Sequence, residues 1–125
     1  MFDTTKAYSG FSVDDLAKAR RFYGETLGLE VSDGSNGFLE IRLSGGAAVF
    51  AYAKVTHTPA SFTILNFPVA DVEAAVDDLS ALGVATKIYS DDEIRTDAKG
   101  IMRGHGPDIA WFRDPAGNVL SVHSG

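Results

Sequence analysis

The sequence predicts an α+β fold built from two βαβββ modules, which together are expected to form a cupped mixed sheet. The first of three observations is a repeat, because the motif at residues 11–16 recurs at residues 67–72. The second is that each copy leads through an amphipathic stretch to a Leu-Gly pair followed by an apolar residue, at 27–29 and 82–84. The third is that the hydrophobic period changes in the same order in both halves, from strand to helix and back to strand.

The first module opens with a strand and a helix. Residues 7–13 alternate between two faces, one of which carries Phe11 and Val13, and this alternation is typical of a strand. Asp14 or Asp15 is then expected to cap a helix, because a carboxylate accepts hydrogen bonds from the free N–H groups of a first turn. Apolar residues follow at helical spacing as far as the first Leu-Gly pair, whose glycine is a good helix terminator.

Three further strands complete the first module. They are predicted at residues 29–32, 38–43 and 47–53, with stretches rich in Gly, Ser and Asn between them that are prone to form turns. Residues 54–60 then form a short linker to the second module.

The second module repeats this order. Its helix has the clearer apolar stripe, with Asp71 as the expected cap and Gly83 as the expected terminator. Residues 114–118, Asp-Pro-Ala-Gly-Asn, are expected to form the last turn. The strands after the helix are predicted at residues 84–89, 109–113 and 119–123.

The two modules, 1–57 and 58–125, are expected to pack as one compact domain. A single βαβββ unit has one helix, which covers only one face of its sheet. The other face is cupped by the twist of the sheet, and a ligand is expected there.

Composition excludes several classes of protein. The chain has 125 residues, a net charge of −6 and no cysteine, which excludes zinc fingers, thiol catalysis and iron–sulfur clusters. It has no basic stripe for nucleic acid, no apolar run that approaches the roughly 18 residues of a membrane span, and no signal-peptide pattern at the N-terminus. We therefore expect a cytoplasmic protein with neither nucleic acid nor a membrane as its partner.

The duplicated plan resembles the vicinal oxygen chelate superfamily, which includes glyoxalase I, bleomycin resistance proteins and extradiol dioxygenases. The openings at 11–16 and 67–72 carry the resemblance, together with the closing stretch at 111–120, whose Asp-Pro-small-Gly-Asn turn is the most specific part. The resemblance implies the glyoxalase/bleomycin resistance fold over nearly the whole chain, apart from the unmatched segment 90–107.

The resemblance also indicates where metal-dependent members hold a divalent cation. The corresponding positions here are Tyr8, Ile64, Ser121 and either Phe50 or Tyr52. Such a site needs about three imidazole or carboxylate ligands, and none of these side chains is one. We therefore expect no metal, no cofactor and no catalytic residue, and we expect the cup to be an aromatic and polar ligand site.

The candidate ligand-binding residues lie on the expected cup strands or in the loop before the final hairpin. Each also has a structural interpretation: the aromatic residues can be ordinary core, Asn66 can belong to a buried network, and Ser121 can be a small space-keeping residue. The candidates are Tyr8, Phe50, Tyr52, Ile64, Asn66, Arg103, His105, Trp111 and Ser121.

The histidines and the acidic run are weaker candidates. His105, in a glycine-rich loop with Arg103, is either part of a lid that recognises an anionic group or part of a flexible connector. His57 is expected to be solvated in the linker. His123, which shares a face with Ser121 near the C-terminus, is expected to lie at the surface, with a place at the mouth of the pocket as the alternative. The run at 91–93 lacks the ordered pattern of a calcium loop and is expected to be a solvated loop.

Three functions remain open at this point. The favoured one is a metal-free protein that binds a hydrophobic or aromatic, antibiotic-like small molecule, which the resemblance associates with a homodimer. The alternative is a metal-dependent lyase, isomerase or dioxygenase of the same superfamily with unusual ligands, such as His105, His123 or Glu40. The third and weakest is an interaction module without a small ligand.

Overall fold

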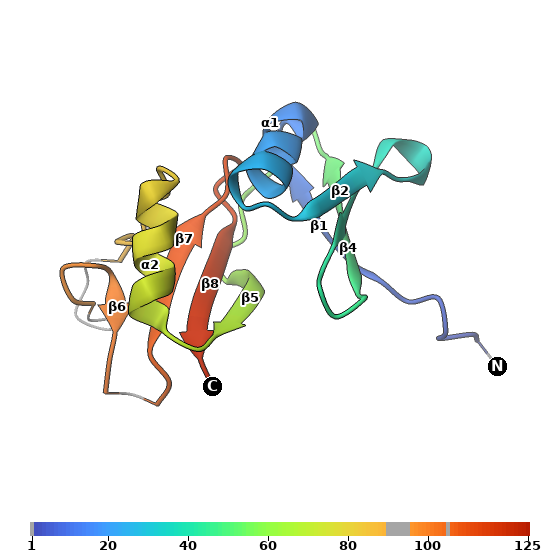
Figure 1. The fold of residues 1–125 in the computed structure, drawn as a ribbon. Helices are drawn as coiled ribbons and strands as arrows, with labels where there is room; N and C mark the ends of the chain where they lie inside the picture. Colours follow the sequence, from blue (N-terminus) through green and yellow to red (C-terminus); the bar gives the residue numbers. More distant parts are fainter. Residues whose placement is uncertain (1, 90–95, 105) are drawn as a thin grey trace. The chain divides into compact units, whose positions relative to one another are not determined.

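The computed structural model describes residues 2–89, 96–104 and 106–125 (Figure 1). The chain divides into two compact units, Met1–Pro59 and Ala60–Gly125. Each unit contains a four-stranded mixed sheet and a helical segment, which confirms the predicted α+β class. The packing of the two modules into one compact domain stays a prediction.

The first unit follows the predicted βαβββ order. Its sheet has the strand order β1-β4-β3-β2, in which β1 and β4 are parallel and the other neighbours are antiparallel. Its elements are β1 (Ser9–Val13), α1 (Leu16–Arg20), the π-helical turn η1 (Arg21–Thr26), β2 (Glu30–Asp33), the 3-10 turn η2 (Ser35–Gly37), β3 (Leu39–Arg42) and β4 (Ala48–Ala53).

The helical segment of this unit begins and ends where the sequence predicts. The carboxylate of Asp15 accepts hydrogen bonds from the first-turn amides of Ala17 and Lys18, which identifies Asp15 as the cap. The segment ends at Gly28, whose φ of 74° lies in the left-handed region that glycine adopts without strain. Its buried Tyr23 packs against Phe11 of β1, with ring centroids 5.7 Å apart, so the Phe11 face of the sheet is the covered one.

The second unit is built in the same way. Its sheet has the strand order β5-β8-β7-β6, with β5 parallel to β8, and α2 lies along β7 and β8 (Figure 1). Within the described parts of the chain, no helix has the length and apolar character needed to cross a membrane. The elements are β5 (Thr63–Val69), α2 (Val72–Ala81), β6 (Ile101–Met102), β7 (Ile109–Arg113) and β8 (Val119–Ser124).

Local signals again fix the ends of the helix. Asp71 caps α2 by accepting a hydrogen bond from the amide of Ala74, and Gly83 follows the helix with a φ of 83°. The apolar stripe of α2 buries Val76 and Leu79. Both the cap and the terminator agree with the prediction.

The prediction of a strand at residues 84–89 is wrong. The structure assigns no strand to these residues, and the two-residue strand β6 instead joins the edge of the sheet beside β7. The amide of Ile88 donates to the carbonyl of Thr86 only two residues earlier, and such a tight turn interrupts an extended strand. The hydroxyl of Thr86 then donates to the carbonyl of Lys99, 2.6 Å away, in place of a backbone ladder.

The turn between β7 and β8 is held by a buried polar network. Asp114 and Asn118 are 4% and 2% exposed. The Asp114 carboxylate accepts hydrogen bonds from the amides of Ala116 and Asn118 and from the Asn118 side chain. The Asn118 side-chain oxygen accepts one from the amide of Ala60, so the turn fixes the start of the second unit as well as its own hairpin.

Candidate functional site

The sheet of the first unit has an open face that carries aromatic side chains. Phe11 and Val13 of β1 are buried on the covered face, so by alternation Gly10 and Ser12 belong to the opposite one. Their partners in the parallel β1–β4 ladder share that face. We call this surface the aromatic face, and its aromatic residues are Tyr8, Phe38, Phe50 and Tyr52.

The rings of the aromatic face contact one another in a continuous cluster. The ring of Phe50 lies 4.7 Å from that of Tyr8 and 6.5 Å from that of Phe38, and Phe38 lies 5.8 Å from Tyr52, measured between centroids. Tyr8 is 64% exposed and Tyr52 is 37% exposed. The cluster is therefore neither a closed core nor a set of isolated rings, and it presents ring surface on which a flat apolar molecule can stack.

The ring of Phe50 lies close to the backbone of the segment between β2 and β3. A Cβ atom at Gly34 would lie 3.1 Å from the ring of Phe50, so the absence of a side chain at Gly34 lets the chain between β2 and β3 approach that ring closely. Phe50 contacts the rings of both Tyr8 and Phe38, which makes it the centre of the cluster. Sequence analysis identified Tyr8, Phe50 and Tyr52 but missed Phe38, which is the first residue of the predicted strand 38–43 and directly precedes β3.

A polar pair adjoins the aromatic face. The hydroxyl of Ser12 and Nδ1 of His57 are 2.7 Å apart, and Ser12 is the cross-strand neighbour of Tyr52. The prediction that His57 is solvated in the linker is therefore wrong. A turn in which the amide of His57 donates to the carbonyl of Lys54 brings the imidazole back onto β1, where it is half-buried.

The second sheet also has an open face, on the side opposite α2. Phe112, Leu120 and Val122 are buried, whereas the register places Trp111 beside Ser121 and Ser121 beside Asn66. These three candidates thus lie in one row across β7, β8 and β5, as alternation along the strands requires. We call this row the polar row.

Hydrogen bonds and one ring contact fix the polar row. The Ser121 hydroxyl donates to the side-chain oxygen of Asn66 at 2.7 Å, and the Trp111 indole N–H donates to the Thr63 hydroxyl at 3.2 Å. The ring of Tyr89 meets that of Trp111 edge-on, with centroids 5.1 Å apart and an interplanar angle of 88°. Sequence analysis missed Thr63 and Tyr89.

Strict alternation along β5 would place Ile64 on the same face as Asn66, but the structure does not show strict alternation. The ladder between β5 and β8 shifts register between Thr63 and Leu65. Thr63, three residues before Asn66, consequently bonds to Trp111 in the polar row. Ile64 sits within this irregularity and is half-buried.

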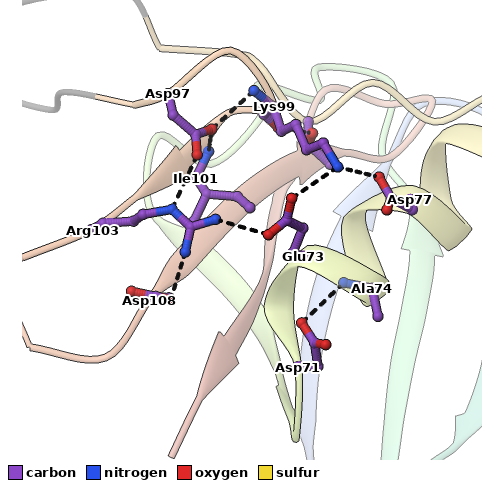
Figure 2. Close-up of polar contacts among 10 residues, drawn as sticks. Asp71, Glu73, Ala74, Asp77, Asp97, Lys99, Ile101, Arg103 and Asp108 are labelled. Carbon is purple, nitrogen blue, oxygen red and sulfur yellow. Dashed lines mark hydrogen bonds and ion pairs between the residues drawn. The ribbon is translucent and has the colours of Figure 1, made fainter.

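Arg103 lies in a network of ion pairs, which Figure 2 shows. Its guanidinium contacts the carboxylates of Asp97 and Asp108 at 3.1 Å and that of Glu73 at 3.5 Å, and Lys99 binds Glu73 as well at 3.0 Å. These contacts fasten the segment before β7 to α2. Because the Arg103 donors face carboxylates of its own chain, the arrangement gives no support to an anion-recognising lid, and we leave Arg103 out of the proposed site.

This network makes a small, pH-dependent contribution to stability through Asp97. Desolvation raises the pKa of Asp97, but hydrogen bonds from the Ile101 amide, Arg103 and the Lys99 amide together hold it below its ordinary value of 3.8. The ionised carboxylate therefore stabilises the folded chain above about pH 4, and this contribution is lost as the pH falls through the lowered value. We expect Asp97→Asn to lower the free energy of unfolding at neutral pH by less than about 1 kcal/mol, since solvent screens this exposed group.

Urea denaturation of Asp97→Asn and of the unmodified chain, at neutral pH and well below pH 3, tests this. The difference between them should shrink at the lower pH. A difference that grows on acidification would contradict the assignment.

The fold and the sequence both match one known superfamily. The family model described as Glyoxalase/Bleomycin resistance protein/Dioxygenase superfamily matches residues 7–122. The chain belongs to this superfamily. A comparison with curated protein sequences found no significant match.

Solved structures of other superfamily members share the fold. TnmS3, an antibiotic binding protein from Streptomyces sp. CB03234, is 26% identical with a TM-score of 0.68, and the match covers 98% of each chain. A glyoxalase/bleomycin resistance protein from the same organism is 27% identical with a TM-score of 0.62, covering 94% of this chain and 99% of that one. A superfamily member from Sphaerobacter thermophilus DSM 20745 is 20% identical with a TM-score of 0.72, covering 98% and 100%, and shows likeness of fold alone.

The metal site of some glyoxalase-superfamily members does not fit the residues present. Among residues 2–89, 96–104 and 106–125, no three His, Asp or Glu side chains lie close enough together to hold a metal ion. Of the alternative ligands, Glu40 forms an ion pair with Arg42 at 2.7 Å, and Nδ1 of His123 lies 3.3 Å from the carbonyl of Ser124. The candidate His105 and the acidic run 91–93 lie outside the described residues.

Proposed function

We propose that the chain is a small-molecule-binding protein that holds a hydrophobic, antibiotic-like aromatic ligand without a metal. The observation that carries this proposal is the exposed ring cluster of the aromatic face. Tyr8, together with Phe50 or Tyr52, occupies positions where the family resemblance places metal ligands. An aromatic ring there cannot bind a divalent cation as imidazole or carboxylate does, but it can stack on a ligand ring.

Physical chemistry favours binding over catalysis at this face. Small-molecule sites are mostly apolar and aromatic, with a few polar groups that fix orientation. The aromatic face has this composition, with the Ser12–His57 pair beside its rings. Burial of one aromatic ring of the ligand against Tyr8 and Phe50 is worth about 1–2 kcal/mol, from ring contact and from the apolar area removed from water.

The relatives support a binding role. TnmS3, at 26% identity over nearly the full length of both chains, is an antibiotic binding protein. We propose a ligand of the same general class here, a hydrophobic or aromatic small molecule. We also propose that the chain forms a homodimer, which the resemblance implies; static light scattering on the purified chain tests this by giving its mass in solution.

The proposal predicts that Phe50→Ala weakens the binding of a flat apolar probe, 9H-fluorene-2-carboxylate, by about tenfold. Isothermal titration calorimetry measures the dissociation constant, and circular dichroism checks that the variant is folded. Phe62→Ala is the matched control, since Phe62 is 69% exposed and outside the cluster, and it should leave the constant unchanged.

The same titration with and without a chelator separates the proposal from its metal-dependent alternative. Binding should be equal in EDTA and in buffer containing divalent cations. Binding that is lost in EDTA and restored by one cation would favour the metal-dependent lyase, isomerase or dioxygenase. Equal affinities for Phe50→Ala and Phe62→Ala would remove the aromatic face from the site.

A further inference from the structure

The hairpin between β2 and β3 turns at an Asn-Gly pair, residues 36 and 37. The φ angles of Asn36 and Gly37 are 60° and 77°, and positive values at both central residues are those of a type I′ turn. The amide of Phe38 donates to the carbonyl of Ser35 across the turn, at 3.2 Å. Both residues of the pair are exposed, so water reaches the turn.

Asn36 differs from the other asparagines of the chain. The sequence contains no glutamine, so its side-chain amides are those of Asn36, Asn66 and Asn118 alone. Asn118 is 2% exposed, and its amide donates to Asp114. Asn66 accepts a hydrogen bond from Ser121. Both are followed by a residue with an aromatic or branched side chain, whereas Asn36 is followed by glycine, whose backbone nitrogen no Cβ atom shields.

This arrangement permits loss of the side-chain amide without an enzyme. The backbone nitrogen of Gly37 loses its proton and attacks Cγ of Asn36. The new N–Cγ bond closes a succinimide ring, and the Cγ–NH₂ bond breaks to release ammonia, which takes up the proton. Water then opens the ring at either carbonyl. Opening at Cγ leaves an ordinary aspartate, and opening at the backbone carbonyl leaves an isoaspartate, whose main chain runs through Cβ and Cγ.

The two products act differently on the turn. An aspartate keeps the backbone unchanged and tolerates the left-handed conformation as asparagine does. An isoaspartate lengthens the main chain by one carbon, so the hydrogen bond from Phe38 to Ser35 no longer closes a turn of the same size. The ring of Phe38 lies 6.5 Å from that of Phe50 and 5.8 Å from that of Tyr52. The longer turn therefore displaces Phe38 from the aromatic face.

We propose that Asn36 is a site of spontaneous deamidation, and that its isoaspartyl product weakens binding at the aromatic face. The reaction needs no co-reactant other than water. The modification goes beyond the proposed function, and its effect on binding rests on that function. The chain thus loses affinity as it ages, and the loss is faster at higher pH because the attacking nitrogen must first lose its proton.

Incubation of the purified chain for several days in mildly alkaline buffer tests the site. Peptide mass spectrometry should show the mass gain from NH₂ to OH at Asn36, with Asn66 and Asn118 as internal controls in the same sample. Asn36→Gly is the matched variant, because glycine adopts a positive φ without strain but has no side-chain amide, and its mass should not change. An unchanged mass of the unmodified chain, or equal conversion at all three asparagines, would overturn the site.

Isothermal titration calorimetry with 9H-fluorene-2-carboxylate tests the effect on binding, in about 0.15 M salt to screen the added charge. The aged chain should bind about threefold more weakly than the fresh chain, the worth of a displaced ring contact. Fresh Asn36→Asp carries the same added charge on an unchanged backbone and should bind like the fresh chain. An isoaspartate-specific methyltransferase, which returns isoaspartate to aspartate, should restore the affinity of the aged chain.

The three ways in which this experiment can fail are distinct. Deamidation at Asn36 with equal affinity before and after would overturn the effect on binding. A loss of affinity that also occurs in aged Asn36→Gly would overturn it too, because another change would then be the cause. Failure of the fresh chain to bind the probe at millimolar concentration would overturn the proposed function, and the mass measurement would still decide the site.

Discussion

Asp114→Ala is expected to lower the free energy of unfolding by about 3 kcal/mol. Asp114 is 4% exposed and accepts hydrogen bonds from the amides of Ala116 and Asn118, at 3.0 and 2.8 Å, and from the Asn118 side chain at 3.1 Å. Removing the carboxylate leaves these donors without their acceptor, two of them on the buried Asn118, and an unsatisfied buried donor costs roughly 1–3 kcal/mol. The losses add incompletely because the turn can relax.

Urea denaturation followed by circular dichroism measures this change. Asp33→Ala is the control, since Asp33 also contacts a partner, Arg20, but at the surface with its side chain 84% exposed. An exposed ion pair contributes at most about 1 kcal/mol. Equal losses in Asp114→Ala and Asp33→Ala would show that the turn network does not stabilise the fold.

Local sequence signals predicted most of the fold. The caps Asp15 and Asp71 act on amides two or three residues away, and Gly28 and Gly83 end their helices through their own backbone angles. Such features depend on neighbours in the sequence and can be read from it. The strand predicted at 84–89 does not form, and the conformation of these residues depends on a contact between Thr86 and Lys99, which is far along the chain. Alternation alone cannot reveal that contact.

The candidate site was predictable to the extent that it follows from strand alternation. Register placed Trp111, Ser121 and Asn66 in one row, and all three were candidates. Thr63 joins the row only because of the register shift in β5, and no pattern in the sequence predicts that shift. His57 was misjudged because a turn in the linker, rather than the linker's composition, returns its ring to β1.

Gly100→Ala is expected to destabilise the second unit by about 3 kcal/mol or more. Gly100 has a φ of 84°, a conformation that costs a residue with a side chain about 1–2 kcal/mol. A Cβ atom there would also lie 2.5 Å from the carbonyl oxygen of Thr86 and 2.9 Å from Cα of Lys87. Both are backbone atoms that cannot rotate away. Residues 84–88 must therefore move away from the segment before β6, which weakens the hydrogen bond between Thr86 and Lys99.

Gly104→Ala separates the two costs. Gly104 has the same φ of 84°, but a Cβ atom there would meet nothing within 4 Å, so only the conformational cost of about 1 kcal/mol remains. Urea denaturation of both variants should therefore give a difference of about 2 kcal/mol, which is the cost of parting Gly100 from Thr86. Hydrogen exchange should quicken at residues 84–88 in Gly100→Ala alone. Equal losses of stability in both variants would mean that the close approach at Gly100 contributes nothing, and that residues 84–88 are held to the unit in another way.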